Sequence, residues 1–208
     1  MESIISAPNP TLVCLSPLTF RREILVQMET HERQQVLDQL ASSEARLLQL
    51  LDGLTPAQWN FRESPERWSI AENVEHLVLF EEFIMQAVTR SLKTAAEPDK
   101  RASASEKQHL VLGLANARHI KFNSREVVRP AGRWTDTAEL VAELRNARAR
   151  TIAFATQTQA DLCEHFFAHI AFGDLDCYQW LLLMGQHTLR HLLQIEAVRA
   201  DPAYPAAD

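Results

Sequence analysis

Apolar residues recur at three- and four-residue steps in long segments of this chain, the spacing that lines one face of an α-helix. The first segment covers about residues 31–52, and Gly53 follows it as a stop signal. Later segments begin at Ser69, near Thr137 and after Gly173. Only 5 glycines occur among 208 residues, which disfavours short strands joined by glycine-rich turns. The pattern therefore predicts an all-α fold.

Capping signals mark the starts of these segments. Ser69 and Glu72 form a capping box, in which each side chain accepts a hydrogen bond from the main-chain amide of the other residue. Thr55 and Gln58 repeat this pattern around a short helical turn with proline at its first position. The candidate caps of the two later helices are Thr135 or Thr137 and Asp174 or Asp176.

The segments differ in composition along the chain. Residues 1–28 contain three prolines and show no clear period, so they are expected to form an irregular N-terminal extension. Residues 94–134 are polar and contain Pro98 and Pro130, which predicts a long crossover with a short helix inside it. An apolar content of 46% supports one core, which we place in residues 29–205. Long helices with one long crossover predict a four-helix bundle.

Charge and cysteine usage exclude several classes of function. The formal net charge is -6 and the basic residues are dispersed, so binding to nucleic acid is not expected. The 3 cysteines are widely spaced, which argues against a disulfide framework and favours a reducing cytoplasm. No apolar run approaches the roughly 20 residues that cross a bilayer. We therefore expect a cytoplasmic protein with no membrane segment.

His187 and His191 are four residues apart on the last predicted helix, so their imidazoles stand on the same face. Two imidazoles at this spacing can bind one metal ion, although the spacing alone is a weak signal among 8 histidines. His76, near the start of another predicted helix, is the candidate third ligand. Three neutral imidazoles suit zinc, nickel, copper or iron and leave one coordination position open.

Other polar residues offer alternatives. His165 and His169 are also four apart, but they precede a turn where helical continuity is doubtful, so a loop role is expected. Cys177 lies roughly 15 Å along the helix from His187, too far to share its metal. Asn73 and Gln194 can orient a ligand or a water molecule, or can be ordinary polar surface residues. The tryptophans indicate packing more readily than substrate stacking.

The sequence resembles the DinB-like superfamily of helical bundles. The resemblance rests on residues 54–59 (LTPAQW), 68–77 (WSIAENVEHL), 172–180 (FGDLDCYQW) and 187–195 (HTLRHLLQI), and it spans about residues 31–205. It implies a bundle in up-down-down-up order that holds one divalent metal ion, usually zinc or nickel. The metal ligands that it implies are His76, His187 and His191.

The resemblance also suggests an activity. Characterised relatives include thiol S-transferases that use bacillithiol, mycothiol or glutathione, and a maleylpyruvate isomerase, and dimers are common among them. We therefore expect a homodimeric, metal-dependent S-transferase that joins a low-molecular-weight thiol to an electrophile. One alternative is a metal-dependent hydrolase, whose base would be Glu72, Glu75 or Glu81. Another is a non-enzymatic bundle whose metal supports folding.

Overall fold

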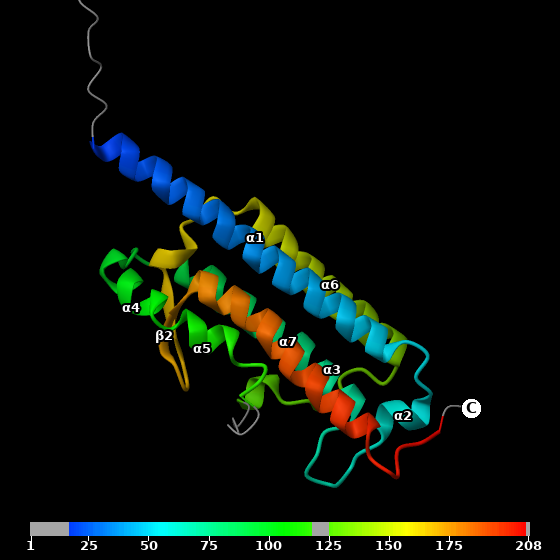
Figure 1. Cartoon of the computed structure of the whole chain (residues 1–208). Coiled ribbons are helices and arrows are strands. Elements are labelled where there is room, and N and C mark those ends of the chain that lie inside the picture. Colours follow the sequence, from blue (N-terminus) through cyan, green and yellow to red (C-terminus); the bar gives the residue numbers. More distant parts are fainter. Residues whose placement is uncertain (1–16, 118–124, 207–208) are drawn as a thin grey trace, which may run out of the picture.

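The computed structural model describes residues 17–117 and 125–206, with side chains from residue 31 onward. Its long helices are α1 (Pro17–Leu51), α3 (Ile70–Ser91), α6 (Thr137–Gln157) and α7 (Cys177–Arg199), as Figure 1 shows. The shorter elements are α2 (Pro56–Asn60), η1 (Pro98–Lys100), α4 (Arg101–Ser105), α5 (Gln108–Leu112), η2 (Glu126–Val128), η3 (Leu162–Glu164), β1 (Phe166–His169) and β2 (Gly173–Asp176). The prediction of an all-α bundle is confirmed.

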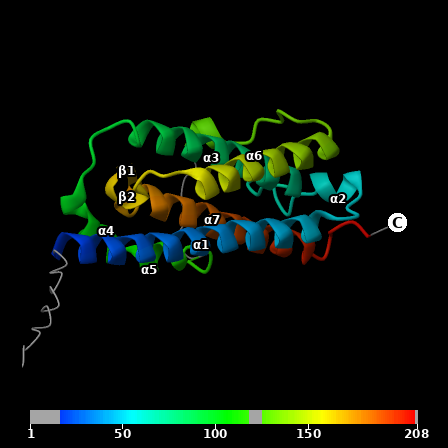
Figure 2. The same ribbon diagram turned by 90° about the horizontal axis from the view of Figure 1, so that it is seen from above.

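The long helices pack in a ring in which α1 and α3 each contact both α6 and α7. Figures 1 and 2 show that α3 and α6 run in one direction and α1 and α7 in the other, which is the up-down-down-up order. Because α3 and α6 are parallel, the chain must return along the bundle between them, and η1, α4, α5 and η2 lie in this crossover. The long crossover is therefore a requirement of the topology.

The predicted caps are mostly present. Thr55 and Ser69 each complete a capping box before α2 and α3, and Asp176 completes one with Gln179 before α7. Gly53 adopts a φ of 68°, the left-handed conformation that ends α1. The predicted cap of α6 is wrong: Asp136 lies between the two threonines considered and accepts the hydrogen bond from Ala138.

Helix α1 begins at Pro17, so residues 17–28, which were expected to be irregular, are helical. The prolines in this region suggested a break in structure. Proline is nevertheless tolerated in the first turn of a helix, where the main-chain amide has no intrahelical partner. Pro17 occupies this position, whereas Pro8 and Pro10 lie outside the described residues.

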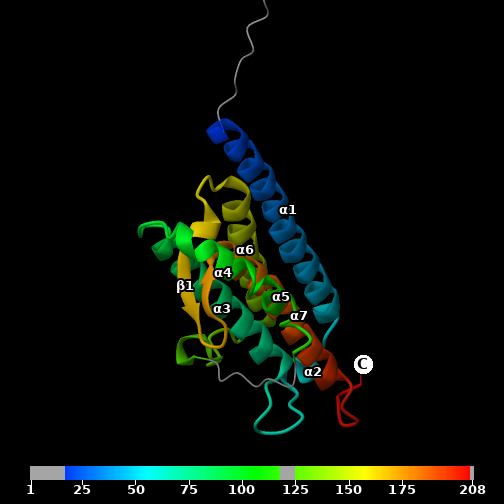
Figure 3. The same cartoon turned by 60° about the vertical axis from the view of Figure 1, so that its left-hand side comes forward.

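A short antiparallel hairpin was not predicted. Strands β1 and β2 pair from Phe166 opposite Asp176 to His169 opposite Gly173. Each strand has only 4 residues, too few for an alternating apolar pattern to stand out from a loop. The hairpin contacts α3 through β1 and α7 through β2, and Figure 3 shows it on the side of the bundle away from α1.

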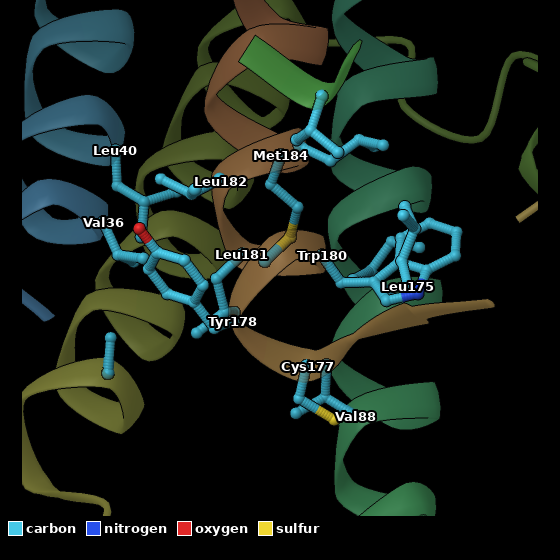
Figure 4. Close-up of a cluster of buried hydrophobic side chains, with 14 of the residues drawn as sticks. Val36, Leu40, Val88, Leu175, Cys177, Tyr178, Trp180, Leu181, Leu182 and Met184 are labelled. Carbon is cyan, nitrogen blue, oxygen red and sulfur yellow. The ribbon is translucent and has the colours of Figure 1, made fainter. Parts of the chain in front are cut away.

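Helix α7 lies at the centre of the packing. The consecutive residues from Trp180 to Met184 are all buried. Five successive helical residues point in all directions around the axis, so this part of α7 is covered on every side. Figure 4 shows Val36 and Leu40 of α1 on one side of this part of α7, and Val88 of α3 beside Cys177 at the start of the helix. At Gly185 a Cβ atom would lie 3.2 Å from the Cβ of Gln39, so glycine permits the close approach of α1 and α7.

None of the helices in the described ranges combines the length and apolar character needed to cross a membrane.

Candidate metal centre

Helices α3 and α7 bring His76, His187 and His191 together. The helices are antiparallel, so the N-terminal half of α3 lies beside the C-terminal half of α7. The Nε2 atom of His187 lies 3.4 Å from Nε2 of His76 and 3.3 Å from Nε2 of His191. The three residues form a group whose candidate ligand atoms all lie within 4.8 Å of one another.

The opposite nitrogens of two imidazoles are held by oxygen atoms. Nδ1 of His76 lies 2.6 Å from the main-chain oxygen of Val128 in η2, and Nδ1 of His191 lies 2.8 Å from Oδ1 of Asn73. A carbonyl oxygen can only accept, so each Nδ1 donates its proton. The Nε2 atoms then carry lone pairs that face the centre of the group, as a metal ligand requires.

The orientation of Asn73 is determined by its own contacts. Its Nδ2 atom donates to the main-chain oxygens of Ser69 and Trp68, at 2.8 and 3.3 Å. Because both acceptors contact Nδ2 of Asn73, the other polar atom of its side chain, Oδ1, faces His191. Asn73, singled out in the sequence as a candidate ligand-orienting residue, thus lies in the first turn of α3.

Aromatic rings surround the imidazoles. Phe80 stacks on His187 with ring centroids 3.9 Å apart, and the half-buried Trp68 lies 4.9 Å from the ring of His76 and 6.1 Å from that of His191. These rings exclude water and lower the local dielectric constant. Nδ1 of His187 is buried and, within the described part of the chain, has no hydrogen-bond partner.

Burial keeps the three imidazoles neutral. It lowers the pKa of His76 to about 4, against a smaller opposing effect of the hydrogen bond to Val128. Burial also lowers the pKa values of His187 and His191 well below the ordinary range, and the positive charge of Arg190 acts in the same direction on both. A hydrogen bond between His191 and the Gln194 side chain opposes this effect at His191 and raises its pKa. Neutral imidazole is the form that binds metals.

The donor set fits a divalent metal ion. The Nε2 atom of His187 lies 3.3 Å from that of His191 and 3.4 Å from that of His76, so one cation between the three imidazoles can be bound by all of them. Tetrahedral Zn–N bonds of about 2.0–2.1 Å separate neighbouring nitrogens by about 3.4 Å, which matches the spacing found here. Three protein ligands leave a fourth position for a substrate atom or water, the arrangement of catalytic zinc sites.

The histidines line a cavity of about 510 Å³, a size typical of small-molecule sites. Its walls come from α3, α7, the hairpin and the crossover. Trp68, Phe80, Phe83, Phe167 and Trp180 give it an apolar, aromatic surface. Gln194 also lines it, and its role in orienting a ligand or a water molecule stays a prediction.

Comparison with known proteins agrees with this geometry. A family model described as the DinB superfamily matches residues 39–195, a span that includes all three histidines. The chain belongs to the DinB superfamily. An uncharacterised protein of Bacillus subtilis strain 168, YuaE, is 28% identical over 149 residues, which cover 72% of this chain and 88% of YuaE. No solved structure matches the chain significantly.

The carboxylates considered as a base in this DinB-superfamily protein are engaged elsewhere. Glu72 closes the capping box with the amide of Ser69 and pairs with Arg62. Glu75 accepts hydrogen bonds from the main-chain amides of residues 131, 132 and 133, at 2.9 to 3.1 Å. Glu81 pairs with the buried Arg148 at 2.9 Å. None of the three lines the cavity.

The second histidine pair of this DinB-superfamily chain, His165 and His169, does not join the group of three histidines. Nδ1 of His165 lies 3.1 Å from the main-chain oxygen of Ser91, and Nδ1 of His169 accepts from the amides of Ala171 and Phe172 at the turn between the strands. His169 nevertheless lines the cavity, and burial lowers its pKa to about 4. Its place beside the cavity was missed because the hairpin was not predicted.

Proposed function

We propose that this DinB-superfamily protein is a metal-dependent thiol S-transferase that joins a low-molecular-weight thiol to an electrophile. The observation that carries the proposal is the convergence of three neutral Nε2 donors at the wall of an apolar cavity. Such a site offers an open coordination position in surroundings from which water is partly excluded. Zinc or nickel suits three imidazole ligands, and zinc is the metal whose bond lengths the spacing matches.

A bound metal ion of this kind lowers the pKa of a thiol, so that the nucleophilic thiolate is available at neutral pH. Residues of the chain orient the metal ligands and shield the site. Asn73 and the main-chain oxygen of Val128 hold two imidazoles in the required tautomer, while Trp68 and Phe80 shield the nucleophile from water.

The chemical step is a nucleophilic substitution. The thiol proton passes to solvent, the sulfur lone pair forms the new carbon–sulfur bond, and the leaving group departs with the electron pair of the bond that breaks. The cavity of about 510 Å³ has room for both reactants, and holding them together removes much of the entropic part of the barrier.

Hydrolysis is the weaker alternative. Activation of water in metal-dependent hydrolases is aided by a nearby carboxylate base. Among the described residues, Glu66 is the only carboxylate that lines the cavity, and it is exposed at the edge. Glu72, Glu75 and Glu81 are occupied by structural contacts.

The proposal is tested with protein purified without a histidine tag. Metal content is measured by elemental analysis, and thiol consumption is followed with glutathione, cysteine, coenzyme A, bacillithiol and mycothiol against bromobimane. We expect a rate above the uncatalysed reaction with at least one thiol, lost in His187→Ala and kept in His31→Gln, which alters an exposed histidine of α1. Turnover of esters or amides without thiol would support the hydrolase instead. A chain that binds metal and has neither activity would support the non-enzymatic bundle.

A further inference from the structure

The cavity has an excess of positive charge. Among the described residues that line it, three carry a guanidinium, namely Arg67, Arg125 and Arg190, whereas the single carboxylate is that of Glu66. His169 adds no charge at neutral pH, because burial and the neighbouring Arg125 lower its pKa to about 4. A divalent cation at the histidines would add to this excess. The lining thus favours a ligand with negative charge.

Arg190 provides positive charge deep in the cavity. Its side chain is only 8% exposed, and its Nη1 atom donates to the main-chain oxygens of Leu114 and Ala117, at 3.3 and 2.8 Å. These contacts hold the guanidinium in place at the wall. A fixed guanidinium recognises an anionic oxygen with little loss of side-chain entropy on binding.

Arg67 and Arg125 lie at the exposed edge. The guanidinium of Arg125 lies 5.5 Å from the ring centre of Phe83, which also lines the cavity. Arg67 donates to Glu63 at 2.7 Å, so much of its charge is compensated. Arg125 at the edge and Arg190 at depth are therefore the candidate groups for binding an anion.

Part of the cavity wall is apolar. Phe167, Ala168 and Ile170 of the hairpin line it together with Trp180 and Leu183 of α7. Ile170 lies at the turn of the hairpin and is 70% exposed. An apolar ligand body placed against the hairpin would cover Ile170. The cavity thus combines an apolar wall with positive charge.

We propose that the electrophile used at this site is an apolar molecule with a carboxylate or similar anionic group. Its body lies against the hairpin wall, and its anionic group binds Arg190 and Arg125. This inference rests on the proposed function, which requires an electrophile as the second reactant. A thiol can also carry a carboxylate, so the binding experiment leaves the thiol out and separates the two sources of negative charge.

Binding is measured by calorimetry with naphthalenesulfonate and with the uncharged naphthalenemethanol, on the protein as purified and after chelation. The sulfonate is a poor metal ligand, so its affinity reports on the arginines. We expect it to bind about tenfold more tightly than the alcohol, and we expect Arg125→Gln and Arg190→Gln each to remove most of this preference. Arg150→Gln, which alters an exposed arginine outside the cavity, leaves it unchanged.

Equal affinities of the sulfonate and the alcohol would overturn the inference, as would arginine variants that weaken both probes alike. Arg190 also donates hydrogen bonds to the main chain just after α5, so the Arg190→Gln variant can disorder that segment. The exposed Arg125 then keeps the test valid, because its guanidinium contacts the ring of Phe83 at the edge of the cavity and anchors no segment of the described main chain there.

A rate experiment separates this inference from the proposed function. Bromomethylbenzoate and its methyl ester are compared as electrophiles, each relative to its uncatalysed reaction. A preference of about tenfold in kcat/KM for the free acid supports the inference, whereas thiol transfer with no preference overturns it and leaves the proposed function standing. If no thiol is consumed while the sulfonate still binds through the arginines, the proposed function fails and the anion site remains.

Discussion

Asn73 and His191 are joined by a hydrogen bond of 2.8 Å that links the start of α3 to the end of α7. The asparagine donates to the main chain of its own helix and accepts from the imidazole of the neighbouring helix. One side chain thus fixes both the position of α3 and the tautomer of His191. The capping box at Ser69, a turn earlier, places Asn73 at this point.

Removing this acceptor should weaken metal binding. We expect Asn73→Leu to lower metal affinity by about 10–100-fold, because the His191 ring loses the partner that orients it. Asn73→Asp keeps an oxygen toward His191 and should retain most of the affinity. A competition titration against a chromophoric chelator measures both variants. Wild-type affinity in Asn73→Leu would show that the imidazole is positioned by packing alone.

The buried ion pair of Arg148 and Glu81 should be important for stability. Arg148 is 2% exposed and donates to Glu81 on α3, to Leu40 and Ser43 on α1, and to Thr188 on α7. We expect Arg148→Ala to reduce the free energy of unfolding by about 3–5 kcal/mol, because the carboxylate of Glu81 stays buried without its partner. Chemical denaturation measures this change.

Two further variants identify the cause of that loss. The double variant Arg148→Met, Glu81→Leu removes both charges and should recover much of the lost stability. Arg150→Ala breaks exposed ion pairs to Glu82 and Glu143 and should cost less than about 1 kcal/mol. Equal losses in Arg148→Ala and Arg150→Ala would contradict the role assigned to the buried pair.

Glu75 should hold the crossover against α3. Its carboxylate accepts from three successive main-chain amides, and this contact lies next to the turn that presents the Val128 oxygen to His76. We expect Glu75→Gln to speed hydrogen exchange at residues 131–133 and to lower metal affinity, because an amide offers one acceptor instead of two. Glu139→Gln, on the exposed face of α6, is the control and should change neither.

The metal-free protein should lose stability in mild acid. The folded-state pKa values of His76 and His169 are about 4, below the value near 6.5 of an unfolded chain. Between these values each of the two histidines binds more protons in the unfolded chain, so their contribution to the free energy of unfolding falls as the pH drops from about 6.5 to 4. Denaturation of chelated protein across this range measures the slope. His76→Asn keeps a donor for Val128 and should give a shallower dependence; an unchanged slope would argue against a buried neutral His76.

The sequence predicted the long helices because each has a periodic apolar face, and because α3 and α7 also have caps that act within one turn of the chain. The capping boxes at Thr55 and Ser69 and the stop at Gly53 are such signals, and they are confirmed. The hairpin escaped prediction because strands of 4 residues leave almost no periodic trace. Pro17 was misleading because proline both ends and begins helices.

The candidate site was only partly predictable for a related reason. The spacing of His187 and His191 follows from a single helix, whereas their meeting with His76 depends on how α3 packs against α7. The hydrogen-bond partners of the imidazoles also differ in how far they could be predicted from the sequence. Asn73 lies on the same helix as His76 and was singled out, but Val128 is 52 residues away along the chain and contributes only its main chain. The homodimer and the cytoplasmic location stay predictions.

The central claim is that His76, His187 and His191 bind one metal ion, and X-ray absorption spectroscopy with elemental analysis on tag-free protein tests it most directly. We expect about one divalent ion per chain with three imidazole nitrogens at roughly 2.0–2.1 Å for zinc, and a thermal unfolding midpoint that falls on chelation. Variants with glutamine at any of the three positions should lose the ion, and His31→Gln should keep it. A wild-type chain that takes up no metal, or a His187→Gln chain with an unchanged spectrum, would contradict the claim.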